Sequence, residues 1–319
     1  MIETEFARVA LKTDTFSVEV LPALGGKVAS MRKNGIELLQ QPLLPYAART
    51  LATAFEESDA SGFDECLPSV SACDIDSPGG AVSVPDHGEF WRISHEAISL
   101  NDKEMRMVAT GGVLPLRLER KLRLEQGSGR HKPDALHIDY RLENVGRDEI
   151  RYAWSAHPLF AVDPGDSIHL PAEVRTVTVE SSAHSRLGAN RAVHPWPFAQ
   201  TPAGEFINLD RVGHETDNVG DKLYVAAPAD DGWAAIVRKT ARLRVQVEFD
   251  PGLTPWLGMW LCYGGWPENK ALRQYCVALE PCTSPVDSLA SAMAAGQART
   301  LAPGQCDFWW MRIVTTVVS

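Results

Sequence analysis

The sequence predicts an all-β protein, a large antiparallel β-sandwich with minimal helix. The first observation is that apolar and polar residues alternate with a period of two, which is typical of strands that bury one face. The second is the regular spacing of turn residues between these runs, and the third is the near absence of helical periodicity. The alternating runs cover residues 16–20, 114–124, 136–142 and 243–249. The turn signals include Gly25-Gly26, Asn34-Gly35, Gly111-Gly112, Pro164-Gly165 and Pro251-Gly252.

Two segments depart from this strand pattern. The alanine-rich stretch from Val286 to Ala295 predicts one short helix, because Gly296 follows it and suits the left-handed conformation of a helix cap. The stretch from Ser181 to Val219 contains several prolines and little alternation. Such a long irregular segment is either a functional loop, for example the wall of a binding site, or a surface excursion without a role. The histidines of this segment are His184, His194 and His214.

The length and composition indicate one globular domain that binds a small ligand. The 319 residues could hold two average domains, but large β-sandwiches often exceed about 200 residues, and no internal repeat or low-complexity linker divides the chain. We therefore expect a single domain over residues 1–319, as a monomer or a homodimer. The net charge of −10 is spread along the chain, which disfavours binding to nucleic acid or to an anionic membrane.

The amino terminus and the cysteines favour a cytoplasmic location. Residues 1–9 lack the basic and apolar regions of a signal peptide, and no stretch reaches the roughly 18 apolar residues of a membrane span. The six cysteines form no CxxC pair, and a chain of this length needs no disulfides to fold. We expect free, buried thiols, which fit a reducing compartment.

Several kinds of chemistry lack their sequence motifs. The nine histidines show no HExxH motif and no zinc-type spacing with cysteine. Neither a GxxxxGK[ST] loop nor a GxGxxG turn after a strand is present, and no GxSxG elbow occurs. We therefore expect no metal and no cofactor. Acid and base catalysis by histidine, aspartate and glutamate is the chemistry that the sequence still supports.

Two short segments place titratable residues beside aromatic ones. In residues 62–68 (GFDECLP), Asp64 and Glu65 form an acidic pair that either stabilises a turn or serves a site. In residues 85–91 (PDHGEFW), His87 lies in a turn shortly before Trp91. This histidine is either solvated or lines, together with Trp91, a wall against which a sugar ring stacks.

Two further segments end an apolar strand at a proline. In residues 153–160 (AWSAHPLF), His157 is either a core histidine satisfied by the backbone or a rigidly held functional group. In residues 276–281 (CVALEP), Glu280 follows three apolar residues. A carboxylate at the end of a buried strand costs free energy unless it is paired or functional. Proton transfer needs such rigid placement, so His157 and Glu280 are the candidate acid/base pair.

Taken together and in this order, the four segments resemble the aldose 1-epimerase (galactose mutarotase-like) family over nearly the whole chain. The resemblance implies the large β-sandwich, or supersandwich, of that family and a cofactor-independent isomerase that acts on a sugar. By this resemblance His87 is the sugar-binding histidine, His157 the acid and Glu280 the catalytic base. Asp221 is the best match to the substrate-binding aspartate of the family. Nearby alternatives are Asp217, Asp230 and Asp231.

The chain departs from the family pattern at residues 62–68. Family members carry an asparagine-arginine segment there, whose arginine contacts the sugar, whereas this chain has Asp64 and Glu65. A carboxylate accepts hydrogen bonds from sugar hydroxyls where an arginine donates them, so either acid is a candidate substrate-binding residue and the usual substrate of the family does not follow from the resemblance. Cations that could serve elsewhere in the site are Arg49, Arg151 and Lys222.

The resemblance implies exchange between the α and β anomers of a free sugar. An ionised Glu280 would take the proton of the C1 hydroxyl while a protonated His157 donates to the ring oxygen, so that the ring opens. Two other classes remain open. A non-catalytic carbohydrate-binding module would need the aromatic and acidic residues only. A glycosidase or lyase would pair Glu280 with Asp64 or Glu65 as its second carboxylate.

Overall fold

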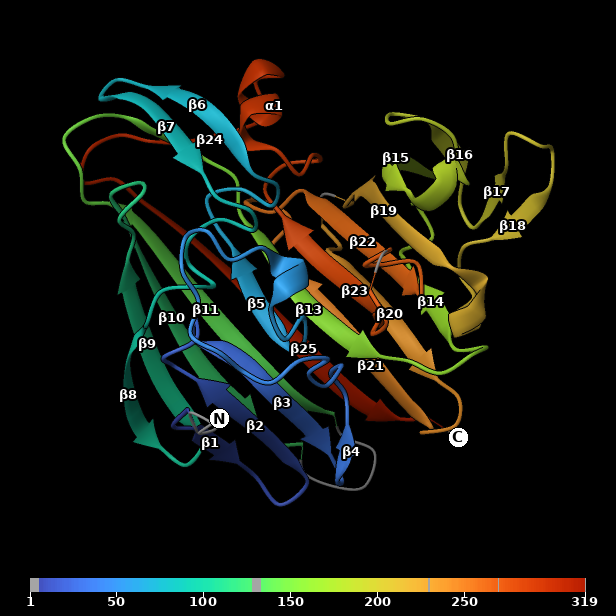
Figure 1. Ribbon diagram of the computed structural model, residues 1–319. Coiled ribbons are helices and arrows are strands. Elements are labelled where there is room, and N and C mark those ends of the chain that lie inside the picture. Colours follow the sequence, from blue (N-terminus) through green and yellow to red (C-terminus); the bar gives the residue numbers. More distant parts are fainter. Residues whose placement is uncertain (1–5, 128–132, 229, 269, 319) are drawn as a thin grey trace.

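The computed structural model of the chain describes residues 6–127, 133–228, 230–268 and 270–318, in which two large antiparallel sheets pack against each other (Figure 1). Eleven of the described strands form the large sheet: β1 (Val9–Lys12), β2 (Phe16–Leu21), β3 (Lys27–Lys33), β4 (Ile36–Glu37), β5 (Phe63–Cys66), β13 (Ser155–Ala161), β15 (Thr176–Ser182), β16 (Val193–Pro195), β19 (Val219–Ala226), β22 (Trp256–Tyr263) and β23 (Tyr275–Cys282). Their order is β1-β2-β3-β5-β13-β23-β22-β19-β15-β16, with β4 beside β3.

Eight described strands form the smaller sheet: β8 (Glu96–Asn101), β9 (Glu104–Thr110), β10 (Leu116–Glu125), β11 (Asp134–Asn144), β14 (Ser167–His169), β20 (Trp233–Arg238), β21 (Leu243–Phe249) and β25 (Cys306–Val317). Their order is β14-β20-β21-β25-β11-β10-β9-β8. Short strands pair outside the two sheets: β6 (Cys73–Ser77) with β7 (Gly80–Val84), β12 (Ile150–Tyr152) with β24 (Arg299–Leu301), and β17 (Phe198–Gln200) with β18 (Phe206–Asn208). The predicted all-β sandwich with minimal helix is confirmed.

The alternating runs of the sequence form strands that bury one side. In β10 and β11, buried and partly exposed residues alternate along most of each strand. Their register places Leu118 opposite Leu142 and Leu122 opposite Ile138, so the apolar residues of both strands lie on the same face. This face packs into the core between the two sheets.

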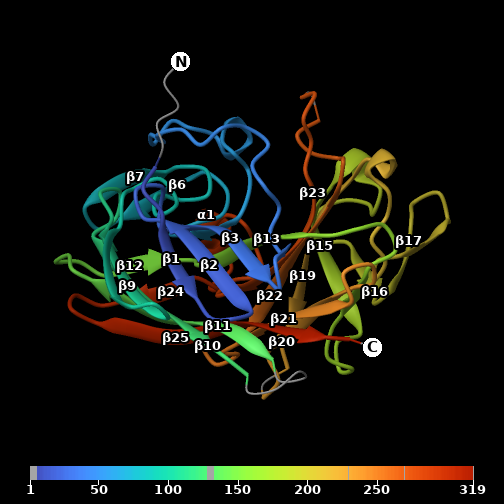
Figure 2. The same ribbon diagram turned by 90° about the horizontal axis from the view of Figure 1, so that it is seen from below.

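The central strands of the large sheet are buried on both faces. Nearly every residue of β13 and β23 is buried, which fits the lack of apolar and polar alternation in their sequences. Loops cover the face that points away from the smaller sheet. Figure 2 shows the blue loop between β4 and β5 and the orange loop between β22 and β23 rising on that side. We call this side the outer face of the large sheet.

The register of three neighbouring strands sets up the outer face. Residue His157 on β13 lies opposite Asp64 on β5. On the other side of β13, Ser155 is opposite Cys282 and Leu159 is opposite Ala278, so His157 is opposite Glu280 on β23. Residues directly opposite each other point to the same face of a sheet. Asp64, His157 and Glu280 therefore form one row across the large sheet.

The two segments that depart from the strand pattern have different outcomes. A short helix is confirmed: α1 (Leu289–Ala294) begins after Ser288, whose hydroxyl accepts a hydrogen bond from the Ser291 N–H at 3.3 Å, and Gly296 has the expected positive φ of 68°. The segment from Ser181 to Val219 is more regular than expected, since it holds β16, β17 and β18 and two of the 3₁₀ turns. The 3₁₀ turns of the described chain are η1 (Phe55–Glu57), η2 (Ala183–Ser185) and η3 (Glu215–Asp217).

All six cysteines are free thiols, as expected from their spacing. Four of them are buried, and Cys73 and Cys306 are partly exposed. Within the described part of the chain, no helix has the length and apolar character that crossing a membrane requires.

Candidate functional site

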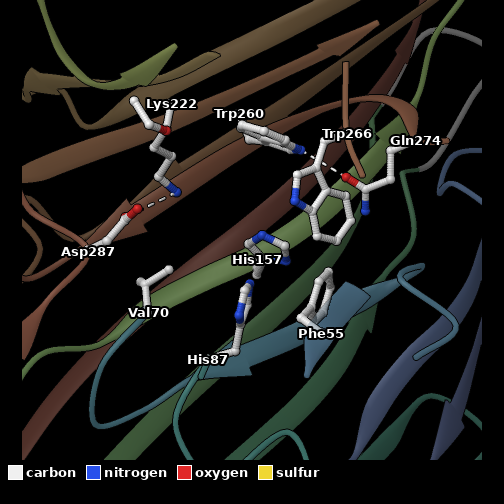
Figure 3. A pocket seen from close by; sticks show the side chains of 10 residues that line it. Phe55, Val70, His87, His157, Lys222, Trp260, Trp266, Gln274 and Asp287 are labelled. Carbon is white, nitrogen blue, oxygen red and sulfur yellow. Dashed lines mark hydrogen bonds and ion pairs between the residues drawn. The ribbon is translucent and has the colours of Figure 1, made fainter. Parts of the chain in front are cut away.

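A pocket opens on the outer face of the large sheet, above the central strands. It is open to solvent and holds about 160 Å³ of space that water-sized molecules can enter. Figure 3 shows an ammonium and a carboxylate on one side of two histidines and aromatic side chains on the other. The lining residues are Phe55, Val70, His87, His157, Ser181, Lys222, Trp260, Trp266, Gln274 and Asp287.

Aromatic rings form one wall of the pocket. Phe55, from the η1 turn, stacks on His87 with ring centroids 4.1 Å apart, and the rings of Trp260 and Trp266 meet edge to face at 6.4 Å. The Trp260 indole N–H donates to the side-chain oxygen of Gln274 at 2.9 Å (Figure 3). Apolar faces with polar groups at their edges suit a ligand that has both C–H faces and hydroxyls, such as a sugar ring.

Two histidines meet at the floor of the pocket. His87 sits in a turn with a positive φ of 57°, and its Nδ1 lies 2.9 Å from a carboxylate oxygen of Asp86. Its ring stands perpendicular to that of His157, with centroids 5.2 Å apart. Strand β13 positions the His157 ring, and the turn at His87 positions the His87 ring. Both histidines therefore have fixed orientations in the pocket.

His157 and Glu280 come together as their register predicts. The Nε2 atom of His157 lies 3.7 Å from Oε1 of Glu280, and both side chains are buried. Among the described residues, neither Oε1 of Glu280 nor Nδ1 of His157 has a hydrogen-bond partner. A buried polar atom without a partner costs free energy, so these two atoms mark the pair as candidate functional groups.

Burial changes the proton affinity of both groups. It lowers the pKa of His157 well below the ordinary value, and the charges of His87 and Lys222 act in the same direction. It also raises the pKa of Glu280, although the Lys222 ammonium opposes that rise. The pKa of the histidine is therefore lowered and that of the carboxyl group is raised. Groups perturbed in this way beside a pocket are characteristic of acid/base sites.

Lys222 on β19 lies between the two acids of the site. Its ammonium donates a hydrogen bond to Oε2 of Glu280 and lies 3.8 Å from Oδ1 of Asp287. The same Asp287 oxygen accepts a hydrogen bond from the Tyr224 hydroxyl at 2.5 Å. Burial alone would lower the pKa of Lys222, but the charges of Glu280 and Asp287 outweigh burial and raise it. Lys222 is thus a permanent cation that lines the pocket, with the fully buried Glu280 behind it.

Asp221, the predicted substrate-binding aspartate, points away from the pocket. It is fully buried, pairs with Arg186 and accepts a hydrogen bond from the Ser182 hydroxyl at 2.6 Å. Successive residues of a strand point to opposite faces, so Lys222 takes the place on the outer face that we expected for Asp221. The expectation for Asp221 is corrected accordingly.

Asp64 lies on the same face of the sheet as His157, but its carboxylate is paired with buried cations. Its carboxylate lies 2.5 Å from the Lys27 ammonium and 3.3 Å from the Arg49 guanidinium, and Asp59 completes the cluster by pairing with both cations. All four side chains are almost fully buried. Asp64 therefore belongs to an internal ion cluster and does not line the pocket, contrary to the expectation that it binds substrate.

Glu65 points to the opposite face, into the core between the sheets. It accepts hydrogen bonds from Arg120 at 2.8 Å, from the Tyr140 hydroxyl at 3.0 Å and from the Trp154 indole at 2.8 Å. This position excludes contact with a ligand in the pocket and corrects the expectation for Glu65. Neither Asp64 nor Glu65 can then serve as the second carboxylate of a glycosidase in this arrangement.

Trp91 is also a core residue rather than a wall of the site. It is fully buried, and its indole N–H donates to the backbone oxygen of Asp86 at 3.1 Å. The guanidinium carbons of Arg49 and Arg92 lie 4.4 Å from its ring centre, so its faces are covered by protein. Trp91 supports the turn that carries His87, and the stacking surface expected from Trp91 is provided by Trp260 and Trp266.

Most residues of the aromatic wall of the pocket could not be predicted from the sequence. Trp260 is one of two partly exposed residues of β22, whose other residues are all buried, so no alternation marks it in the sequence. Phe55, Trp266 and Gln274 come from loops, where no periodicity marks them. Within the irregular segment, residues 181–219, Ser181 lines the pocket, and none of His184, His194 and His214 does.

Among the described residues, no group of three or more His, Cys, Asp or Glu side chains is arranged to hold a metal ion.

Solved structures resemble this chain closely in fold, although no protein-family model and no curated protein matches its sequence. It is similar to the Slr1438 protein of Synechocystis sp. PCC 6803, with a TM-score of 0.69 and 16% identity over 99% of this chain and 98% of that one. A protein of Escherichia coli K12 that is named provisionally as an aldose 1-epimerase has a TM-score of 0.68 and 15% identity, over 98% of this chain and 99% of that one. A galactose mutarotase related enzyme of Lactobacillus acidophilus has a TM-score of 0.67 and 12% identity, over 98% of this chain and 99% of that one. The chain therefore has the galactose mutarotase-like β-sandwich fold.

Proposed function

From this fold and this pocket, we propose that the protein is an aldose 1-epimerase that interconverts the α and β anomers of a free sugar. The observation that carries the proposal is the approach of His157 Nε2, which lines the pocket, to Oε1 of the buried Glu280, 3.7 Å away. An acid and a base side by side are what anomer exchange needs, since one proton leaves the sugar while another arrives. The aromatic wall and His87 would hold the sugar ring above them.

The proposed reaction opens and closes the ring. Glu280 takes the proton of the C1 hydroxyl, the bond between C1 and the ring oxygen breaks, and the ring oxygen takes a proton from His157. The product is the open-chain aldehyde. Rotation about the C1–C2 bond and reversal of both proton transfers give the other anomer. Electrons and protons balance within the sugar and the two side chains, so the reaction proposed here runs without a cofactor.

A second candidate is a carbohydrate-binding protein without catalysis. The observation that favours it is the contact between Lys222 and Glu280, which keeps the carboxylate out of the pocket in the empty protein. A binding module would use the aromatic wall and the polar rim alone. A glycosidase is less well supported, because Asp64 is held in an internal ion cluster and Glu65 points into the core between the sheets.

Magnetisation-transfer NMR separates these candidates. The rate of exchange between the two C1 proton signals is measured with and without protein, across free aldoses and aldose phosphates. An epimerase accelerates the exchange of at least one free sugar. A binding module broadens or shifts the signals of a sugar without accelerating its exchange, and that result would reject the proposed function.

A further inference from the structure

Lys222 has two carboxylates within reach, and only one of them lies in the pocket. Its ammonium is bonded to Oε2 of Glu280, which is fully buried, and Oδ1 of Asp287 is 3.8 Å away. Both Lys222 and Asp287 line the pocket (Figure 3). A small rotation of the lysine side chain would exchange one carboxylate partner for the other. The rotation would also uncover Glu280.

Among the residues that the structure describes, Lys222 is the cation in contact with Glu280 that balances its charge. Ser155 approaches Oε2 through its hydroxyl at 3.4 Å, and burial keeps the neighbouring His157 largely neutral near pH 7. An unbalanced buried carboxylate is costly and tends to take up a proton instead. The titratable groups that face this carboxylate from the packed elements are His157, Lys222, Asp287, His87, Tyr224, Cys66, Cys276 and Cys282.

Space for the ion pair is made by a glycine. Gly258 on β22 lies opposite both Glu280 and Tyr224. A Cβ atom at this position would lie 3.2 Å from Oε2 of Glu280 and 3.2 Å from the Tyr224 ring. The strand therefore leaves open the volume in which the carboxylate and the lysine meet.

We propose that Lys222 is a positioning residue for the proposed epimerase: it holds Glu280 as a carboxylate in the empty pocket and passes to Asp287 when a sugar hydroxyl takes its place. The inference rests on the proposed function. Lys222 supplies the charge that keeps the base ionised, and Asp287 supplies the second position for that charge. Tyr224 holds Asp287 in place through its hydrogen bond.

The first test follows the titration of Glu280 by carboxyl ¹³C NMR in the empty protein, with Glu280→Gln used to assign the signal. Lys222→Met should raise the titration midpoint by about one to three pH units, the usual effect of removing a cation in contact with a carboxylate. Lys222→Arg keeps the charge and should restore the wild-type midpoint. Lys33→Met removes another buried lysine, which pairs with Asp134, and should leave the Glu280 signal unchanged.

The second test uses Asp287→Asn, which removes the alternative partner and keeps the first. Its Glu280 midpoint should stay at or below the wild-type value, because a negative charge has been removed, while kcat for anomer exchange falls. Lys222→Met is thus expected to raise the midpoint and Asp287→Asn is not, although both should slow the reaction. A merely structural loss would not produce this pattern.

The outcomes separate this inference from the proposed function. If Lys222→Met leaves the Glu280 midpoint unchanged, Lys222 does not hold the base ionised and the inference is overturned, whatever the activity. If Asp287→Asn keeps the wild-type kcat, Lys222 does not need Asp287 as its second partner, and that part of the inference is overturned. If no sugar is exchanged by the wild-type protein, the epimerase proposal fails, and the titration result is unaffected.

Discussion

His157 and Glu280 lie opposite each other on the neighbouring strands β13 and β23, and their side chains approach to 3.7 Å on the outer face of the large sheet. Both strands belong to the middle of an eleven-stranded sheet of the described chain, where packing on both faces restricts movement. The relative position of the two groups is therefore fixed by the backbone. Proton transfer depends strongly on such fixed geometry.

The pH dependence of anomer exchange should be narrow and acidic. Glu280 must be ionised, and its pKa is raised above the ordinary 4.5, so activity is lost as the pH falls through that raised value. His157 must be protonated, and its pKa is lowered below the ordinary 6.5, so activity is lost as the pH rises through that lowered value. The maximum of kcat/KM, which reports the free protein, should lie between these limits. Polarimetry over a pH series measures it. A profile still at its maximum above the ordinary histidine pKa would exclude His157 as the proton donor.

Gly258→Ala should slow the proposed reaction without unfolding the protein. The added methyl group would lie 3.2 Å from Oε2 of Glu280, so the carboxylate must shift. A displacement of about 1 Å can cost about 10²-fold in rate. At 3.2 Å the carboxylate must move by only a few tenths of an ångström, so we expect a loss in kcat of less than about 10²-fold, with little change in KM. Gly79→Ala is the matched control, because nothing lies within 4 Å of the added atom. Equal rates for Gly258→Ala and wild type would show that the base tolerates displacement.

Glu65→Gln should reduce stability rather than sugar binding. The substitution keeps the shape of the side chain but leaves the buried Arg120 without its counterion. Breaking a buried ion pair from one side costs about 3–5 kcal/mol in the free energy of unfolding. Denaturant unfolding measures this loss. Glu119→Gln, which breaks a surface pair with Arg106, should cost less than about 1 kcal/mol. If the folded Glu65→Gln variant binds sugar more weakly than the wild type, Glu65 would be a substrate-binding residue after all.

Much of the fold follows from the sequence because alternation is a local signal. The runs at 114–124 and 136–142 supply most of the neighbouring strands β10 and β11, with the apolar positions facing the core. The pairing of distant strands has no such local signal. Nothing in the order of the residues shows that β5, β13 and β23 are neighbours, and that adjacency is what brings His157 and Glu280 together.

The errors in the predicted site have two physical causes. An offset of one residue along a strand reverses the face, so the choice of Asp221 instead of Lys222 moved the predicted contact to the wrong side of β19. The buried acids are the second cause. A buried carboxylate must be paired or functional, and the sequence cannot show that cations from remote segments pair with Asp64 and Glu65. Glu280 is paired as well, and its contact with His157 beside the pocket distinguishes it.

The most direct test of the central claim is the rate of anomer exchange with Glu280→Gln, measured by magnetisation-transfer NMR on a sugar that the wild-type protein converts. Glutamine keeps the size of the side chain but cannot accept the proton, and acid/base catalysis is worth about 10² to 10⁴-fold. We predict a loss of that order, with sugar binding retained as monitored by tryptophan fluorescence. Exchange by Glu280→Gln at the wild-type rate would contradict the account, because Glu280 would then not be the base.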